Sequence, residues 1–322
     1  MGSEVDGNDA GYIDLSHLAS GEVPDGIDSS TRELDLTNNR IKRFERLEHL
    51  DQLQRLTLRQ NEIRRLPAEL NRLKCLEDLD LYMNFVEEVD PAAFEGLEKL
   101  ERLDLSFNTL RTLTKLEMVD SKNLPMLKEL YLIANKITKI ENLDALGELE
   151  MLELGDNRIR VIENMGSLVG LRSLWLGRNK IARLENLDPL RNLRILSLQS
   201  NRIVKIENLG ALKNLEELYL SHNGIEKIEG LEELTELRVL DLGSNRIRVL
   251  ENVSHLKKLQ ELWLNGNAIC DFGALSELVD LPNLTCVYLE GNPLQTEQPE
   301  QYKQRILDAL PRLTQLDANL VK

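Results

Sequence analysis

The sequence predicts an α/β solenoid, a right-handed coil of short turns with a parallel sheet on its concave side and 3₁₀ or short helical segments on its convex side. Three observations support this prediction. A similar sequence motif recurs about every 22 residues, and leucine and isoleucine occupy fixed positions in it. The last 30 residues have a helical pattern instead. With 322 residues and 42% hydrophobic content, the chain has enough apolar side chains for a continuous core.

The repeated phrase is L-x-x-L-x-L-x-x-N-x-[IL], as in LKNLEELYLSHNGIEKIEGL at residues 212–231. Its asparagine occurs twelve times, at Asn39, Asn61, Asn84, Asn108, Asn135, Asn157, Asn179, Asn201, Asn223, Asn245, Asn267 and Asn292. The steps between them are 22, 23, 24 and 27 residues, then 22 six times, then 25. Twelve copies with this spacing identify leucine-rich repeats.

Each turn is expected to begin with a short strand, L-x-L, whose two leucines point into the core, such as Leu218 and Leu220. The asparagine follows at the bend, where its amide can donate and accept hydrogen bonds between neighbouring turns. The next apolar residue, such as Ile225, closes the core. Twenty-two residues are too few for a long return helix, so we expect 3₁₀ or one-to-two-turn helical pieces on the convex side.

The ends and the early repeats depart from this pattern. Residues 1–11 are expected to form a disordered leader and residues 12–30 an N-terminal cap, followed by about twelve repeats over 31–292, irregular in repeats 2–5. One irregularity, LTKLEMVDSKNLPMLKEL, inserts about one helical turn. Residues 293–322 are expected to form a C-terminal cap, with Tyr302, Ile306 and Leu310 on one helical face and Pro311 ending the helix.

The charge balance argues against nucleic-acid and membrane partners. The chain carries 40 Lys and Arg against 55 Asp and Glu, a net charge of −15, which repels phosphate backbones and anionic lipids. No apolar run is long enough to span a bilayer, and no secretion signal opens the chain.

Three cysteines, Cys75, Cys270 and Cys286, are too few for a disulfide framework, so we expect free thiols, buried or half-buried. These features predict a location in the nucleus and cytoplasm.

No catalytic constellation is visible. The phosphate-binding, dinucleotide-binding, nucleophile-elbow and zinc-protease motifs are all absent from the sequence. We therefore expect no enzyme activity and no cofactor. Asp80 and Asp104 hold the same phase in neighbouring turns and could approach one metal ion, but a solvated acidic face is the favoured interpretation, so no metal site is expected.

The concave face is the predicted binding surface. Each turn offers four positions there: the residue before the first strand leucine, the residue between the two, and the two that follow. These positions hold seven of the chain's 13 aromatic residues, namely Tyr82, Phe107, Tyr131, Trp175, Tyr219, Trp263 and Tyr288. They also hold twelve acidic residues and four arginines. Solubilising charge is one interpretation. The aromatic excess favours another, a protein partner with a basic or mixed surface that fits aromatic knobs.

The return segments KIENLDALGELEMLELGDNRIRVIENM and LYLSHNGIEKIEGLEEL, and the cap VYLEGNPLQ…YKQRILDALPRLTQLDA, resemble the SDS22-like leucine-rich repeat family of protein phosphatase 1 regulators. The resemblance covers roughly residues 30–320. It implies a non-catalytic protein that binds the catalytic subunit of protein phosphatase 1 through the concave face, restrains it and assists its biogenesis. It also implies a ternary complex with a small inhibitor protein, and a monomer when free.

Transferred position by position, the resemblance implies a contact set of Asp104, Tyr131, Glu153, Trp175, Asp241, Glu261, Trp263 and Tyr288. We add Tyr219, which shares the aromatic position. The alternative is a generic leucine-rich repeat scaffold, or an adaptor of a ubiquitin ligase or cilium, for another protein partner. An appended domain would favour the adaptor, and none is visible in the sequence.

Overall fold

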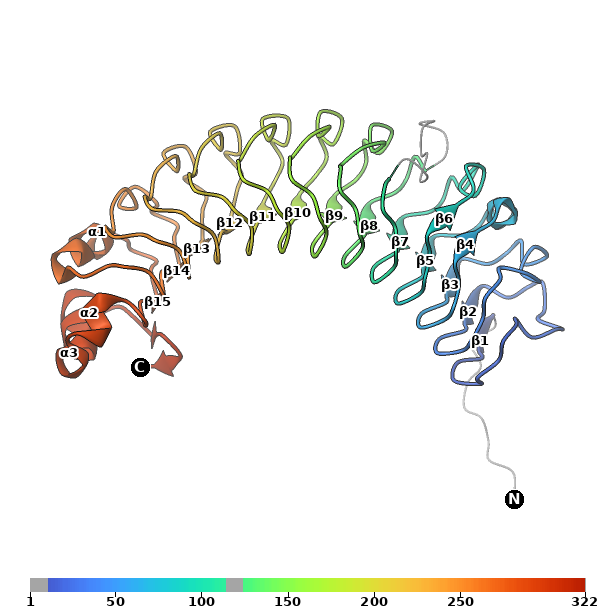
Figure 1. Cartoon of the computed structure of the whole chain (residues 1–322), viewed down its shortest axis with the longest axis horizontal. Helices are drawn as coiled ribbons and strands as arrows, with labels where there is room; N and C mark the ends of the chain where they lie inside the picture. The colour runs from blue at the N-terminus through green and yellow to red at the C-terminus, as the bar shows by residue number, and fades with distance from the viewer. Residues whose placement is uncertain (1–10, 114–123, 322) are drawn as a thin grey trace, which may run out of the picture. The chain divides into compact units, whose positions relative to one another are not determined.

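The computed structural model describes residues 11–113 and 124–321. It divides into two compact units, residues 1–157 (unit 1) and 158–322 (unit 2). In each unit, the main strands line one side of the stacked turns and the return segments line the other (Figure 1). Residues 1–10 of the expected leader lie outside the described residues, as do residues 114–123 of the expected insertion.

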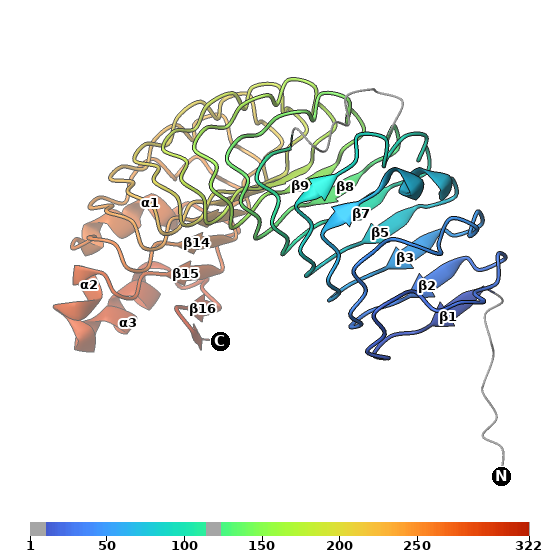
Figure 2. The same ribbon diagram turned by 45° about the vertical axis from the view of Figure 1, so that its right-hand side comes forward.

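Unit 1 is built on seven strands in chain order. They are β1 (Tyr12–Asp14), β2 (Glu33–Asp35), β3 (Arg55–Thr57), β5 (Asp78–Asp80), β7 (Arg102–Asp104), β8 (Glu129–Tyr131) and β9 (Met151–Glu153). All pair in parallel, and the buried leucine of one strand lies opposite that of the next, as Leu34 does with Leu56. Figure 2 shows several of these strands side by side. The residues expected as an N-terminal cap carry β1, which pairs with β2.

The longer second and third repeats hold additional structure. A two-stranded parallel sheet joins β4 (Arg65–Leu66) to β6 (Glu88–Val89). The 3₁₀ helix η1 (Ala68–Arg72) follows β4 and buries Leu70. The extra residues of these repeats therefore widen the turn on the side away from the main strands.

Unit 2 continues the same pattern with β10 (Ser173–Trp175), β11 (Ile195–Ser197), β12 (Glu217–Tyr219), β13 (Val239–Asp241), β14 (Glu261–Trp263), β15 (Cys286–Tyr288) and β16 (Gln315–Leu316). These strands pair in parallel, and β17 (Asn319–Leu320) closes the sheet with an antiparallel pair. Among described residues, no helix is long and apolar enough to cross a membrane.

Stacked asparagines tie the turns together, as the sequence predicts. The Asn201 side chain donates to the carbonyl oxygens of Leu176, one turn earlier, and Leu198 in its own turn, both at 3.0 Å. Its Oδ1 accepts the backbone N–H of Ile181, also at 3.0 Å. One side chain thus satisfies three backbone groups that the bend leaves without partners, and the apolar core is sealed beside it.

The return arms of the regular repeats consist of isolated 3₁₀-type turns, the tighter of the two forms predicted for them. Residues 184–193 contain turns in which Leu190 N–H bonds to Leu187 C=O and Leu193 N–H to Leu190 C=O, both at 3.0 Å. Leucines three residues apart share one face of such a 3₁₀-type chain, so all three are buried. Consecutive bonds of this kind are too few to make a helix.

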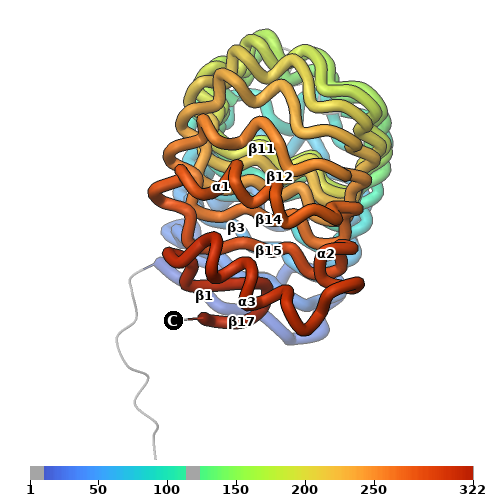
Figure 3. The backbone as a smooth tube through the Cα atoms, turned by 90° about the vertical axis from the view of Figure 1, so that its left-hand side faces the viewer, coloured from blue at the N-terminus to red at the C-terminus, as the bar shows by residue number. Residues whose placement is uncertain are grey.

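The helical structure of unit 2 lies near its C-terminal end, in η3 (Phe272–Leu275), α1 (Ser276–Val279), α2 (Pro293–Thr296) and α3 (Pro299–Ala309), where Figure 3 shows α3 closing the unit. Tyr302, Ile306 and Leu310 are buried, which confirms the predicted apolar face. The Tyr302 hydroxyl donates to Asp317 Oδ2 at 2.8 Å, and Asp317 Oδ1 accepts from the backbone N–H of Leu289 at 2.8 Å. The cap is therefore bonded to the last regular turn.

Candidate protein-binding surface

The parallel register arranges the side chains of each sheet into rows. We call the surface on which strand side chains point away from the leucine core the sheet face. The last residue of each strand is the one between the two inward leucines, and the register places it beside its equivalent in the next strand. In unit 2 this row consists of Trp175, Ser197, Tyr219, Asp241, Trp263 and Tyr288.

The four aromatic residues of this row form what we call the aromatic ladder. Ring centroids of Trp175 and Tyr219 lie 6.1 Å apart with nearly parallel planes. Tyr219 and Trp263 are separated by 6.3 Å, and Trp263 and Tyr288 by 5.8 Å, both edge-on. All four rings are half-buried. The ladder is thus a continuous aromatic surface that still has area to bury against a partner.

Small residues between the rings allow the ladder to close. Two strand spacings separate Trp175 from Tyr219, about 9.6 Å along the backbone. The rings approach more closely because Ser197 stands between them, with 1% of its surface exposed. Asp241 takes the same place between Tyr219 and Trp263 and is 4% exposed. The indole N–H groups of Trp175 and Trp263 are buried without a hydrogen-bond partner.

Asp241 and Asp104 do not present free carboxylates, although both were expected on the binding face. Asp241 Oδ1 accepts the backbone N–H of Gly243 at 2.9 Å, and Asp104 Oδ1 that of Ser106 at 2.9 Å. Both aspartates are buried. An aspartate in this position stabilises the turn that follows its strand, a role that short side chains suit.

The acidic groups that remain accessible around the ladder belong to neighbouring positions. The Tyr219 hydroxyl donates to Glu217 Oε2 at 2.7 Å. Burial and this carboxylate raise the pKa of Tyr219. The side chain of Glu261 makes no hydrogen bond or ion pair with the described residues. Glu261 is therefore a carboxylate in unit 2 that is free to meet a partner's cation.

Unit 1 carries a different surface, centred on Arg102. Its guanidinium contacts Asp78 at 3.0 Å, Asp80 at 3.6 Å and Asp104 at 3.1 Å. It also lies 4.9 Å from the centroid of the Tyr131 ring. This network was not predicted, because it joins Arg102 and Asp104 of β7 to Asp78 and Asp80 of the neighbouring strand β5. Arg102 already neutralises Asp80 and Asp104, which leaves no reason to assign them a metal ion.

Glu153, on β9, is half-buried and makes no hydrogen bond or ion pair with the described residues. Burial, and then the nearby carboxylate of Asp104, raise the pKa of Glu153 to about 7. The register places Tyr131 between Asp104 and Glu153. Unit 1 therefore brings together the three contact residues predicted there, with Glu153 as the carboxylate without a partner.

The predicted set is thus gathered in two groups, one on the sheet face of each unit. Unit 2 holds six of the nine residues: Trp175, Tyr219, Asp241, Glu261, Trp263 and Tyr288. Unit 1 holds Asp104, Tyr131 and Glu153. Sequence spacing locates these residues correctly on their strands. It does not reveal which of them are covered by larger neighbours.

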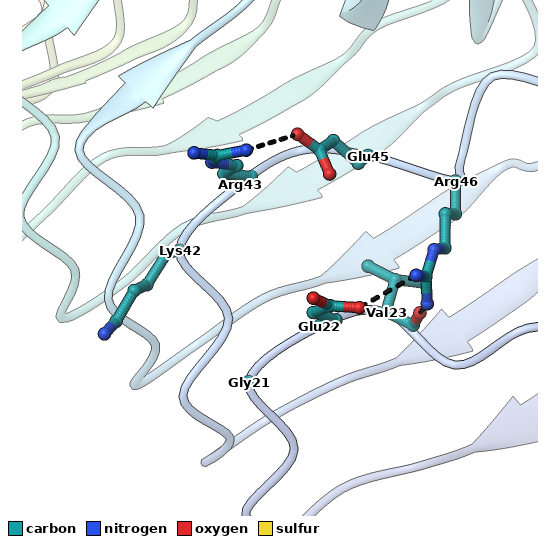
Figure 4. Close-up of a pocket in the computed structure, with 7 residues that line it drawn as sticks. All are labelled: Gly21, Glu22, Val23, Lys42, Arg43, Glu45 and Arg46. Carbon is teal, nitrogen blue, oxygen red and sulfur yellow. Dashed lines mark hydrogen bonds and ion pairs between the residues drawn. The ribbon is translucent and has the colours of Figure 1, made fainter.

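The pocket in Figure 4 lies away from these groups. It is a cavity of about 260 Å³ near the start of unit 1, lined by Gly21, Glu22, Val23, Lys42, Arg43, Glu45 and Arg46. Arg46 pairs with Glu22 at 2.8 Å, and Arg43 pairs with Glu45 at 3.3 Å. Most of the charged side chains that line the cavity are therefore paired with one another. They do not present a group of free polar side chains that could bind a ligand.

The cysteines are free thiols, but not all are buried. Cys286 is buried on β15, and burial raises its pKa to about 11. Cys75 is half-buried. Cys270 is exposed, which makes the expectation of a buried or half-buried thiol wrong there. It follows the buried Ile269, so its side chain turns outward.

Comparison with known families identifies the repeats. Two leucine-rich repeat profiles match the chain, one over residues 74–137 and the other over residues 187–322. A protein phosphatase 1 regulatory inhibitor subunit homologue from Arabidopsis thaliana is 40% identical over 144 residues, which are 43% of this chain and 42% of that protein. Human Toll-like receptor 3 is 46% identical over 92 residues, 27% of this chain and 10% of the receptor. The chain therefore spans less than half the length of these relatives.

Solved structures share the fold at lower identity. An internalin from Listeria monocytogenes aligns with a TM-score of 0.70 and 23% identity, covering 90% of this chain and 88% of the internalin. A leucine-rich repeat protein from Leptospira interrogans aligns with a TM-score of 0.64 and 25% identity, covering 89% and 84%. The twelve-fold motif, the asparagine ladder and these matches confirm the predicted fold, a leucine-rich repeat solenoid, and leucine-rich repeat models match it over residues 74–137 and 187–322.

Proposed function

We propose that this chain is a non-catalytic regulatory subunit that binds the catalytic subunit of protein phosphatase 1. The aromatic ladder of unit 2 is the anchor, and Glu261, Tyr131 and Glu153 provide further contacts. Binding restrains the phosphatase and assists its biogenesis, in a complex that also admits a small inhibitor protein. The proposed setting is the nucleus and cytoplasm, with the chain monomeric when free.

The observation that carries the proposal is the aromatic ladder itself. Four half-buried rings in one row make a partly exposed aromatic surface that the leucine core does not need. Tryptophan and tyrosine are the residue types most enriched at interface hot spots. The Arabidopsis relative, whose name is that of a phosphatase 1 regulatory subunit, supports the choice of partner.

The charge around the ladder supports a partner surface with basic groups. Glu261 has no cation to neutralise it among the described residues, and Glu217 is bound only by the Tyr219 hydroxyl. A carboxylate that is half-buried before binding loses less hydration when a partner covers it. It gains more from a lysine or arginine placed beside it than a fully hydrated carboxylate would.

The test is Trp263→Ala, measured for capture of purified phosphatase 1 catalytic subunit and for melting temperature. We expect capture to weaken by roughly 30- to 1,000-fold, corresponding to about 2–4 kcal/mol for a hot-spot ring. Each lost ring contact costs about 0.5–1.5 kcal/mol of folding stability, so melting should fall only slightly.

Phe85→Ala is the matched control, because Phe85 is an exposed aromatic in unit 1 outside the ladder, 47% accessible. It should bind the phosphatase like the wild type. If Trp263→Ala melts normally and captures the phosphatase as well as wild type does, the ladder is not the anchor. If the wild-type chain fails to capture the phosphatase at all, the alternative of a scaffold for another partner replaces this proposal.

A further inference from the structure

A second surface of unit 2 carries charge of the opposite sign to its sheet face. It begins directly after the repeat asparagine and takes three positions per turn: the residue after the asparagine, and the two residues that follow the buried isoleucine. We call these fifteen positions, in residues 158–161, 180–183, 202–205, 224–227 and 246–249, the lateral strip. Nine of them are lysine or arginine and one is acidic: Arg158, Arg160, Lys180, Arg183, Arg202, Lys205, Lys227, Arg246 and Arg248 against Glu226. The whole chain, by contrast, carries a net charge of −15.

Most of these cations have no internal partner. Lys205 pairs with Glu207 at 3.5 Å. The other eight basic side chains form no hydrogen bond or ion pair with any described residue. A surface cation normally adds to solubility, but eight unpaired cations on adjacent turns repel one another. The strip therefore holds a local positive potential that an anionic partner would relieve.

The backbone holds the strip rigidly. The N–H of Lys180 bonds to the carbonyl of Ile159, that of Arg202 to Ile181, and that of Arg246 to Ile225, each at 2.8 Å. These bonds run from turn to turn, so equivalent residues are about 4.8 Å apart, as in a sheet. Five turns then span about 20 Å, which is the length of about six residues of extended polypeptide.

The strip is also apolar in part. Val161, Val204 and Val249 belong to it and are 42%, 63% and 54% exposed. A purely solvated charged face gains nothing from valines among its arginines. Exposed β-branched side chains between cations instead match a partner that carries both carboxylates and apolar side chains.

A neighbouring row limits the width of the partner. On one side runs a row of half-buried glutamates: Glu163, Glu185, Glu207, Glu229 and Glu251. A nucleic-acid duplex laid along the strip would bring phosphates against this acidic row. Single-stranded nucleic acid would need aromatic stacking platforms, and the strip contains no aromatic residue.

We propose that the lateral strip is a second docking site, which binds an extended acidic polypeptide segment containing apolar residues. The segment belongs to a protein partner and is one chain wide. The site is independent of the aromatic ladder and does not depend on the identity of the ladder's partner. A chain with both sites would bind one protein on its sheet face and the acidic segment of another protein along the lateral strip.

The test uses a fluorescein-labelled peptide, (Glu-Glu-Val)₄, and oligo-dT of twelve nucleotides, measured by anisotropy at 50 mM NaCl. We expect the peptide to bind wild type more tightly than oligo-dT does, and to lose affinity as salt rises. The double variant Arg202→Glu/Arg246→Glu should weaken peptide binding by about tenfold or more. Val204→Ser/Val249→Ser, which keeps every cation, should weaken it by about threefold.

Two controls separate the strip from general charge and from the ladder. Arg191→Glu/Lys303→Glu changes net charge equally at exposed residues outside the strip, and should bind the peptide within about twofold of wild type. Trp263→Ala should leave peptide binding unchanged even if it abolishes phosphatase capture. The proposal is overturned if wild type does not bind the peptide, if oligo-dT binds as tightly, or if the Arg191/Lys303 variant loses as much affinity as the strip variant. It is also overturned if the strip variant, with a wild-type melting temperature, retains full binding.

Discussion

Side chains in the same position of the repeat take different roles, as Asp241 and Trp263 show. Both lie between two inward leucines on neighbouring strands. Trp263 is large enough to remain half-exposed, whereas Asp241 is short, bonds to the Gly243 N–H and is covered by its neighbours. A change of Asp241 to lysine would therefore disturb the turn as well as any interface. Glu261→Lys is the substitution that reports on binding alone.

Glu153 gives a residue-scale prediction on pH. Its pKa of about 7 lies above the ordinary 4.5, so the folded chain holds this proton more tightly than the unfolded chain does. The stability that it contributes is complete below about pH 4.5 and is lost as the pH rises through 7. Glu153→Gln removes the buried charge, so it should raise the melting temperature at pH 8 and change it little at pH 4.5.

The measurement is the melting temperature of wild type and Glu153→Gln from pH 4.5 to pH 8.5. Glu148→Gln, an exposed glutamate of the same unit, is the matched control and should show no such pH-dependent difference. If the melting temperature of Glu153→Gln differs from that of wild type by the same amount at every pH, as expected for Glu148→Gln, then Glu153 is not the titrating group.

At the scale of the turn, stability comes from neighbours. Each L-x-L strand buries its leucines only because the next turn covers them, and each asparagine bonds to the turn before it as well as to its own. No single turn has a core of its own. A substitution that destabilises one turn therefore also destabilises the turns on either side of it.

Leu198→Ala tests this within unit 2. Leu198 is fully buried beside the Asn201 ladder, and the stacked turns on both sides prevent the cavity from collapsing. We expect the free energy of unfolding to fall by about 2–5 kcal/mol. Val204→Ala, six residues away and 63% exposed, should change it by less than about 0.5 kcal/mol. Urea denaturation followed by circular dichroism gives both values, and equal losses would contradict the predicted inward register.

The strands and the asparagine ladder could be predicted from the repeated motif, and the C-terminal helix from the four-residue steps of Tyr302, Ile306 and Leu310. For the return arms, the three-residue spacing of Leu187, Leu190 and Leu193 fits 3₁₀-type turns as well as a short helix, so both forms were predicted and the structure has the turns. The ion pairs of Arg102 were missed because Asp78 and Asp80 lie on the neighbouring strand β5, and only the pairing of the two strands brings them to the guanidinium. The burial of Asp241 was missed because it depends on the size of residues 22 positions away. Sequence spacing predicts the strand position of a side chain and the face on which it lies. Packing between neighbouring turns decides how much of that side chain is exposed.

For the molecule as a whole, charge is separated by surface more than by sequence. Acidic residues on the sheet face and basic residues on the lateral strip alternate within the same 22-residue phrase, so neither forms a run along the chain. The net charge of −15 nevertheless gives the chain a long-range negative field. Such a field acts on the approach of a partner before any contact forms.

This field predicts how salt affects the proposed capture of protein phosphatase 1. Raising NaCl from 50 to 500 mM should slow association by about tenfold, because screening shortens the reach of the field from about 14 Å to about 4 Å. Dissociation should change less than about twofold, since the aromatic contacts that resist it are apolar. Surface plasmon resonance separates the two rates.

Glu261→Lys should reduce the salt dependence of the association rate. Glu233→Lys should reduce it less, because Glu233 is on the exposed return arm, on the opposite side of the turn from the sheet face. An association rate that does not respond to salt would mean that the partner's docking surface carries no basic excess, and the acidic residues of the sheet face would then be solubilising charge.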